Sequence, residues 1–481
     1  MLRFAVALPP SLTMDGNNTL PRRLTLELSA RYHLIGSAYP RPSLADRTHP
    51  SASAAVGLRP SNQLPDRPRR LLLLLLLAAS PCLSLATDYY VSPAGSDSNP
   101  GSLAAPWQTI SKVNSVQFFP GDRILLQGNQ TFTGPMLFTS ASSGTAANPI
   151  VVGTYGSGRA IISSSSDAIN ITDTQGSLIT NLALNGGNHS TNAGRGILLI
   201  NDLDGNIELG PITVSNVDIS NFGYEGVAIY GLNGSSGWRS VSVTNCVVYA
   251  NQDGIQSFGY SPTANQQITI SNCSAHDNPG IPGTGSGSGI VLGDVKDATI
   301  QRCVAYKNGA SNTLGAGPVG IWCYNADKVL IQNNESYNNT GGSGGDGDGF
   351  DLDLNTSNST VQYNYSHGNT GAGYLIGDYK VGGNTVRYNV SQNDGVHDGY
   401  AGIFLWSDVY NTEVDNNWVF TSAPAVAGIH IASGANLKNL NFRDNAIFVT
   451  GTLPIISVST TAGVLFRGND YWRTDGSFLV S

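Results

Sequence analysis

Charged side chains are scarce in this chain, since only 12% of its 481 residues are Asp, Glu, Lys or Arg. Basic residues are the scarcest beyond the N-terminal region: from Asp88 onward, 15 Lys and Arg stand against 29 Asp and Glu, a net charge of −14. A body this acidic argues against binding to nucleic acid or to an anionic membrane surface. We therefore expect no nucleic-acid partner, and we expect the protein to be a monomer.

Long hydrophobic runs are absent, with one exception near the N-terminus. Seven leucines at 71–77 follow a basic segment and precede small residues. This order is typical of a secretory signal, and about 16 apolar residues are few for a membrane span. We predict a disordered leader or an overextended gene model over 1–65, a signal peptide over 66–86 and a secreted, extracellular domain over 87–481. A signal anchor and a transit peptide are the alternatives.

A leucine framework is also absent, although β-type segments recur about every 29 residues. Nine of these segments start with Gly and carry apolar residues at the first and third positions after it. Their glycines are Gly196, Gly226, Gly254, Gly289, Gly320, Gly349, Gly373, Gly402 and Gly428. The missing leucines exclude leucine-rich repeats, and propeller blades need longer repeats. The pattern predicts an all-β fold: a single-stranded right-handed parallel β-helix, a solenoid with about three strands per coil.

The segment before the first repeats predicts an N-terminal helical cap over 87–127. Turn-forming residues crowd 92–101, and Trp107, Ile110 and Val113 would share one face of a short helix. A solenoid exposes its core and its strand edges at each end unless another segment covers them. We therefore expect this segment to cover the first coil.

A second repeated segment lies between the glycine segments, and its last residue is mostly Asn or Cys. These last residues are Val217, Cys246, Cys273, Cys303, Asn334, Asn364, Asn389, Asn417, Asn445 and Asn469. Stacked coils would place these side chains in one interior column, where Asn amides can pair along the axis and satisfy the turn backbone. An even number of cysteines after the signal, the fourth being Cys323, permits disulfides. The shared column favours free, buried thiols instead.

The glycine segments also predict an outer surface. Side chains alternate along a strand, so the apolar positions +1 and +3 after each Gly face inward and positions +2 and +4 face outward. The outward columns are rich in aromatic residues, and we expect Trp322, Tyr324, Phe404, Trp406 and His430 to form an exposed strip that binds a polysaccharide. The alternative is a loop packed over this strip.

One copy alone carries a cluster of acids, Asp346, Asp348, Asp351 and Asp353. Carboxylates this close need a cation or a shared proton. Calcium bound by carboxylates of this cluster is one possibility, because it prefers oxygen ligands from flexible loops. An acid/base pair for glycoside hydrolysis, formed by Asp351 and Asp353, is another. A solvated acidic turn is the third.

Elimination from a uronate needs a base, and Lys380 in the next coil is the only nearby Lys. We therefore include it with Asp351 and Asp353 as a candidate catalytic residue, although surface turns often carry Lys. If the acidic copy has no catalytic role, the turns around Glu225 and Asp253 are the next candidate for the active site.

Three segments of the cap resemble those of secreted, pectate-lyase-like β-helix proteins, including polysaccharide lyase families 6 and 9. They read Tyr-Tyr-Val-Ser-Pro-Ala-Gly-Ser-Asp-Ser-Asn-Pro-Gly at 89–101, Pro-Trp-Gln-Thr-Ile at 106–110 and Pro-Gly-Asp at 120–122. The resemblance implies a right-handed β-helix, calcium held by aspartates and a Lys base. The Asp-Gly-Phe element at 348–350 resembles the calcium region of family 9, and this resemblance implies Asp346, Asp348 and Asp351 as calcium ligands. The sequence departs from that family at Leu375, which follows a Gly-Ala-Gly-Tyr segment where the family carries its Lys.

These observations predict a secreted carbohydrate-active protein. Our first expectation is a calcium-assisted polysaccharide lyase that acts on an acidic polysaccharide such as pectin. A glycoside hydrolase that uses the Asp346 to Asp353 carboxylates is the second. A non-catalytic polysaccharide-binding or adhesive β-helix is the third.

Overall fold

The computed structural model describes residues 86–396, 399–422, 425, 427–432, 435–458, 461–478 and 480. All of them fall in the compact unit Leu72–Ser481. The leader and nearly all of the signal peptide expected from the sequence lie outside the described residues. Within the described part, no helix has the length and apolar character needed to cross a membrane.

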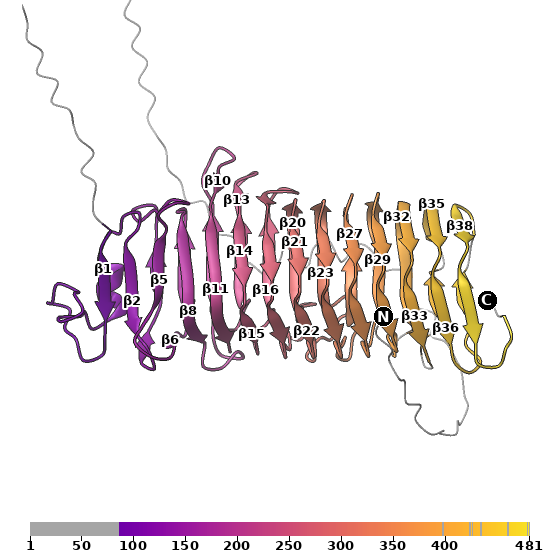
Figure 1. Cartoon of the computed structure of the whole chain (residues 1–481), viewed down its shortest axis with the longest axis horizontal. Helices are drawn as coiled ribbons and strands as arrows, with labels where there is room; N and C mark the ends of the chain where they lie inside the picture. Colours follow the sequence, from indigo (N-terminus) through magenta and orange to yellow (C-terminus); the bar gives the residue numbers. More distant parts are fainter. Residues whose placement is uncertain are drawn as a thin grey trace, which may run out of the picture. The chain divides into compact units, whose positions relative to one another are not determined.

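The described chain winds into a stack of coils whose strands pair in parallel with those of the coils before and after (Figure 1). The strands fall into three faces. The first face consists of β4 (Met136–Phe138), β7 (Ile169–Thr172), β9 (Ile197–Asn201), β12 (Val227–Gly231), β16 (Ile255–Gly259), β20 (Ile290–Lys296), β23 (Val319–Asp327), β26 (Asp348–Leu352), β29 (Tyr374–Gly382), β32 (Ile403–Asp415), β34 (Ile429–Ile431) and β37 (Ile456–Val458). This face contains all nine segments that the sequence marks with glycine.

The second and third faces complete each coil. The second consists of β1 (Asp88–Val91), β2 (Arg123–Gln127), β5 (Ile150–Tyr155), β8 (Ser177–Asn185), β11 (Ile212–Ser220), β14 (Val241–Thr244), β18 (Thr269–Ser271), β21 (Thr299–Gln301), β24 (Leu330–Gln332), β27 (Thr360–Gln362), β30 (Thr385–Arg387), the end of β32, β35 (Asn436–Arg443) and β38 (Val464–Arg467). The third consists of β3 (Thr131–Thr133), β6 (Ala160–Ser163), the ends of β8 and β11, β15 (Val247–Tyr249), β19 (Ser274–His276), β22 (Val304–Tyr306), β25 (Glu335–Tyr337), β28 (Tyr365–His367), β31 (Val390–Gln392), β33 (Trp418–Thr421), β36 (Ala446–Val449) and β39 (Asp470–Arg473). Two short strands, β10 (Glu208–Leu209) and β13 (Gly237–Trp238), pair separately, and β17 (Asn265–Gln266) pairs with the end of β20.

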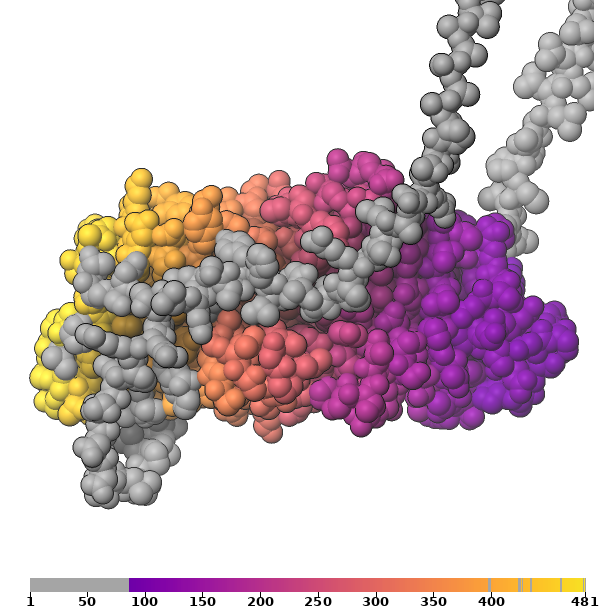
Figure 2. All heavy atoms as spheres, turned by 180° about the vertical axis from the view of Figure 1, so that it is seen from behind, coloured from indigo at the N-terminus to yellow at the C-terminus, as the bar shows by residue number. Residues whose placement is uncertain are grey.

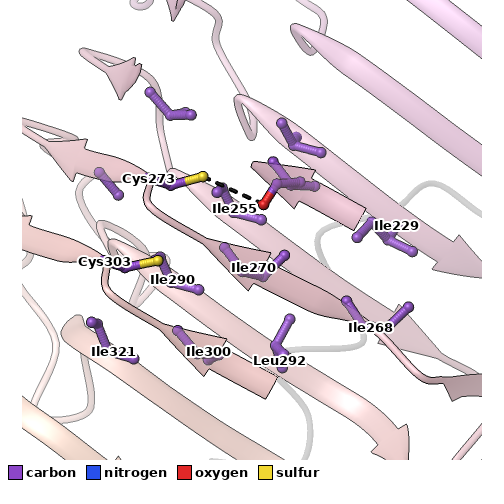
Figure 3. Close-up of a cluster of buried hydrophobic side chains, with 14 of the residues drawn as sticks. Ile229, Ile255, Ile268, Ile270, Cys273, Ile290, Leu292, Ile300, Cys303 and Ile321 are labelled. Atoms are coloured by element: carbon purple, nitrogen blue, oxygen red, sulfur yellow. Dashed lines mark hydrogen bonds between the residues drawn. The ribbon is translucent and has the colours of Figure 1, made fainter. Parts of the chain in front are cut away.

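The interior of the stack is a continuous apolar core. Inward residues of successive coils stack in columns, because one register repeats from coil to coil. Figure 3 shows this for Ile270 and Ile300 of the second face, beside Cys273 and Cys303. These side chains are at most 2% exposed. The predicted right-handed parallel β-helix is therefore confirmed, and Figure 2 shows the described coils following one another in sequence order.

The predicted asparagine column is also confirmed. The side-chain oxygen of Asn364 accepts hydrogen bonds from the backbone N–H and the side-chain amide of Asn334, at 2.9 and 3.0 Å. The same pair of bonds repeats down the column as far as Asn469. The four described cysteines are buried free thiols, as the column favoured.

A second ladder of the same kind, not predicted from the sequence, lies at another corner of the coil. Its members are Asn251, Asn278, Asn308, Asn339, Asn369 and Asp394. Its signal in the sequence is an Asn or Asp two residues after the last residue of the third-face strands. The ladder ends in a carboxylate, since Asp394 accepts from the backbone N–H and the amide of Asn369.

The segment before the first coils contains the one described helix, α2 (Ile110–Asn114). Ile110 and Val113 of α2 are buried together with Trp107, which precedes the helix and stacks on Tyr89 at 4.8 Å. β1 pairs with β2 of the second face. That this segment acts as a cap stays a prediction.

Candidate functional site

The acidic copy lies on the first face, in strand β26 and the residues on either side of it. Asp351 pairs with Trp322 of β23 and with Leu375 of β29. The next coils continue this column with Phe404 of β32 and His430 of β34. The coils thus bring the predicted outward column into register, with Asp351 between an indole and an aliphatic side chain.

The expectation of an exposed aromatic strip is wrong for part of its length. Tyr324 and Phe404 are only 4% and 5% exposed, whereas Trp322, Trp406 and His430 are half-buried. One reason is a turn that precedes β32, because its Tyr400 packs edge-on against Phe404 at 5.3 Å. Side chains of the outward columns also pack against those of the neighbouring coils.

Contacts between neighbouring coils explain this packing. The Phe404 ring stacks on His430 at 5.2 Å, and burial lowers the pKa of His430 although its ring also contacts the Ser457 carbonyl. The Tyr324 ring lies against Gly293, where a Cβ would come within 2.1 Å of the ring. The Trp322 indole donates to the Ser288 hydroxyl at 3.0 Å. The half-buried Trp322, Trp406 and His430 remain the part of the strip that a ligand can reach.

Asp346 anchors two turns. One oxygen accepts from the Gly317 N–H and the other from the Tyr400 hydroxyl, both at 2.7 Å. Burial, followed by the charges of Asp346 and Asp348, raises the pKa of Tyr400, so its hydroxyl keeps its proton and continues to donate. Asp346 therefore holds the turn before β26 against the turn before β32.

Asp348 is fully buried and has a comparable role. One of its oxygens accepts from the Ala372 N–H of the next coil. Asp253, at the equivalent position three coils earlier, accepts from the Gly287 and Ser288 N–H groups at 2.8 and 2.6 Å. An acid immediately before the repeat glycine thus ties one coil to the next.

These contacts bear on the expected calcium site. Both oxygens of Asp346 and one of Asp348 already accept hydrogen bonds from the protein. No three His, Cys, Asp or Glu side chains among the described residues are placed to hold a metal ion. A calcium site at Asp346, Asp348 and Asp351 stays a prediction, and an ion there would have to share oxygens that hold the turns.

Asp351 and Asp353 are the acids of this copy that lie on the outer side of the first face. They are two residues apart, so their Cα atoms are about 6–7 Å apart along the chain. Asp351 is 6% exposed, and Asp353 is half-buried just beyond the end of β26. Leu352 between them points into the core and is 1% exposed. The predicted alternation across β26 is confirmed.

Lys380 lies on β29, five residues beyond Leu375, the partner of Asp351. The register of β29 and β32 shifts between Asp378 and Val381, and Lys380 sits in this bulge with a positive φ of 58°. This irregularity could not be read from the sequence.

A second titratable group lies on the same face in earlier coils. Arg195 pairs with Glu225 at 2.6 Å, and both side chains are largely buried. The Arg195 guanidinium lies over the rings of Tyr224 and Tyr230. Burial, and then the charge of Glu225, raises the pKa of Asp253 to about 7. The sequence pointed to Glu225 and Asp253 but missed Arg195, which precedes a repeat glycine just as the two acids do.

Comparisons with known proteins agree with the fold. A family model described as "Right handed beta helix region" matches residues 109–419. The lacto-N-biosidase of Bifidobacterium longum is 40% identical over 77 residues, which are 15% of this chain and 5% of that protein. The pectate lyase PEL9 of Emericella nidulans is 34% identical over 178 residues, which are 35% of this chain and 40% of that protein.

Each of these matches covers less than half of the curated relative. Among solved structures, the GH136 lacto-N-biosidase of Eubacterium ramulus superposes with a TM-score of 0.54 at 19% identity, over 80% of this chain and 67% of that one. At this identity the likeness concerns the fold alone. The family model spans well over half of the chain, and the chain therefore belongs to the family of right-handed β-helix proteins.

Proposed function

We propose that this protein is a carbohydrate-active enzyme that cleaves a glycosidic bond of a polysaccharide bound across the first face. The observation that carries the proposal is the pair Asp351 and Asp353 on the outer side of this face, with Asp351 in register with Trp322. The names of both curated relatives, a lacto-N-biosidase and a pectate lyase, support carbohydrate chemistry.

Hydrolysis by the two carboxyl groups is the chemistry that we favour. One carboxyl group would protonate the glycosidic oxygen, and the other would activate a water molecule on the opposite side of the sugar ring. This inverting arrangement needs roughly 6.5–9.5 Å between the carboxyl groups, and two outward side chains at i and i+2 start from Cα atoms about 6–7 Å apart. The half-buried Trp322, Trp406 and His430 would contact sugar rings, while Tyr324 and Phe404 support them from below.

Elimination is the second candidate. It is favoured by the match to a pectate lyase, which is the longer of the two curated matches at 178 residues. In this case the substrate would be an acidic polysaccharide such as pectin, and Lys380 would have to act as the base. Because Lys380 follows the Asp351 column by five residues and lies in a bulge of β29, we favour hydrolysis, and calcium has no part in the proposed hydrolytic step.

The test uses the purified secreted form on a panel of neutral and acidic polysaccharides. Hydrolysis releases reducing ends without ultraviolet absorbance, whereas elimination leaves an unsaturated sugar that absorbs. Asp351→Asn and Asp353→Asn should each lower kcat at least about 100-fold. Asp297→Asn, an exposed acid on another part of the coil, is the matched control and should keep full activity.

The outcomes separate the candidates. Absorbing products that disappear in Lys380→Gln would favour elimination. Full activity in both Asp variants would indicate that the active site lies near Glu225 and Asp253 instead. Binding without any product would favour a non-catalytic, adhesive role.

A further inference from the structure

A polar pocket lies apart from the Asp351 column, where the first face turns into the second. Its volume is about 220 Å³, and it is lined by Lys380, Asp408, Tyr410, Asn411, Asn436 and Lys438. These residues come from β29, β32 and β35 of three successive coils. The pocket is large enough for about seven water molecules, and thus for one substituted sugar ring.

The register of the three strands builds this pocket. Tyr410 pairs with Gly382 on one side and with Lys438 on the other, and Asp408 pairs with Asn436. A Cβ on Gly382 would come within 2.4 Å of the Tyr410 ring, so the missing side chain allows the ring to lie against β29. The bulge between Asp378 and Val381 brings Lys380 to the rim. The pocket thus combines the Tyr410 ring with two lysines, and the Lys380 ammonium group lies 4.7 Å from the centre of the Tyr379 ring.

The charge of the pocket contrasts with the rest of the protein. Only six lysines follow residue 87, and two of them, Lys380 and Lys438, line this pocket beside the single acid Asp408. The surrounding body carries a net charge of −14. Two side-chain amides and a phenol add hydrogen-bond donors. Ammonium groups with amide and hydroxyl donors suit an anion on a polar ring, and the Tyr410 ring offers an apolar contact.

We propose that this pocket binds the anionic substituent of a saccharide, a carboxylate or a sulfate, together with the ring that bears it. The inference rests on the proposed function in that the ligand is part of a carbohydrate. It assigns Lys380 a binding role and places recognition of the anion away from the Asp351 column. The substrate class would then be acidic, and cleavage and anion binding would be separable.

The experiment measures binding by saturation-transfer NMR and by titration of amide shifts. The probes are sodium galacturonate, galactose 6-sulfate and neutral galactose. Wild-type protein should bind one or both anions and should bind galactose at least tenfold more weakly, with an affinity for the anions that falls as salt is added. Binding of galacturonate alone would identify a carboxylate, and binding of the sulfate ester alone would identify a sulfated sugar.

Variants link the binding to the pocket. The double variant Lys380→Gln/Lys438→Gln should weaken anion binding at least tenfold. Lys328→Gln is the matched control, because Lys328 is exposed and has a φ of 58°, as Lys380 does, and it should bind like wild type. Undiminished binding in the double variant, or equal binding of galactose and the anions, overturns the proposal.

Failure of this inference is distinguishable from failure of the proposed function. Asp351→Asn should lose activity and keep galacturonate binding. A protein that binds the anions through the two lysines but cleaves nothing would overturn the proposed function alone. A protein that cleaves neutral polymers and binds neither anion would overturn the pocket alone.

Discussion

At the scale of a residue, Leu352 and Asp351 on β26 show that the effect of a substitution depends on which face of the strand the side chain lies on. Leu352 lies in the core, where a carboxylate would be buried without compensation, so Leu352→Asp should abolish cooperative folding. Asp351→Asn keeps the volume of the side chain and removes a charge from the outer side of the same strand. We expect its melting temperature to stay within about 3 °C of wild type. Circular dichroism and calorimetry check both variants, and a well-folded Leu352→Asp would contradict the assigned faces.

Asp394 makes stability depend on pH at a single buried residue. Burial raises its pKa from the ordinary 3.8 to about 6, although it accepts bonds from Asn369 and Ser391. The folded protein therefore holds this proton more tightly than the unfolded chain does. Its contribution to stability is fully present below pH 4 and is lost as the pH rises through 6.

The variant Asp394→Asn tests this linkage. An amide continues the ladder of Asn side chains without a buried charge, so the variant should be more stable than wild type at pH 7, by up to about 3 kcal/mol. The difference should shrink toward pH 4. Denaturant unfolding at both pH values measures it. A variant that is less stable than wild type at pH 7 would show that Asp394 is needed as a carboxylate.

At the scale of an element, the interior ladders stabilise the corners between strands. Asn364→Ala would leave the N–H and amide of Asn334 without their acceptor and would remove the donor to the Ile331 carbonyl. Each buried group left without a partner costs about 1–3 kcal/mol, so we expect a loss of more than about 2 kcal/mol. Chemical denaturation provides the measurement.

The matched control for this ladder is an outward ladder on the same strands. Gln362 donates to Gln332 at 3.0 Å and accepts from Arg387, but it is half-buried, so water can replace its partners. Gln362→Ala should therefore cost less than about 1 kcal/mol. Equal losses for the two variants would mean that the interior ladder adds nothing beyond ordinary side-chain packing.

Strand patterns could be predicted from the sequence because they depend on local alternation. Gly349 and the residues after it fixed which side chains of β26 face the core. The turns could not be predicted in this way, because they depend on contacts between coils. Tyr400 reaches Asp346 from 54 residues away, and a bulge shifts the register of β29 and β32 between Asp378 and Val381, where Lys380 lies. Alternation along a strand separates inward from outward side chains, but it does not show that Tyr400 and neighbouring coils bury part of the aromatic strip.

At the scale of the whole molecule, the columns of the stack bring together side chains that are far apart in sequence. The second acidic group, around Glu225 and Asp253, shares the first face with Asp351 because each coil repeats one register. A bound polymer could therefore contact both groups at once. Because each coil contacts only the coils beside it, a substitution in one coil should affect mainly the stability of its neighbours.

This organisation leads to a prediction about calcium. Oxygens of Asp346 and Asp348 accept hydrogen bonds from Gly317, Tyr400 and Ala372, so a cation at these acids would have to displace some of these bonds. At a free calcium concentration of a hundred times the dissociation constant, calcium binding would add about 2.7 kcal/mol to the free energy of unfolding. It would raise the melting temperature by several degrees. We expect shifts below about 1 °C when calcium is added or a chelator replaces it. Calorimetry at matched ionic strength measures this, with magnesium as the control. A rise specific to calcium that Asp351→Asn removes would instead mean that the acids rearrange around the ion, and the case for elimination would gain accordingly.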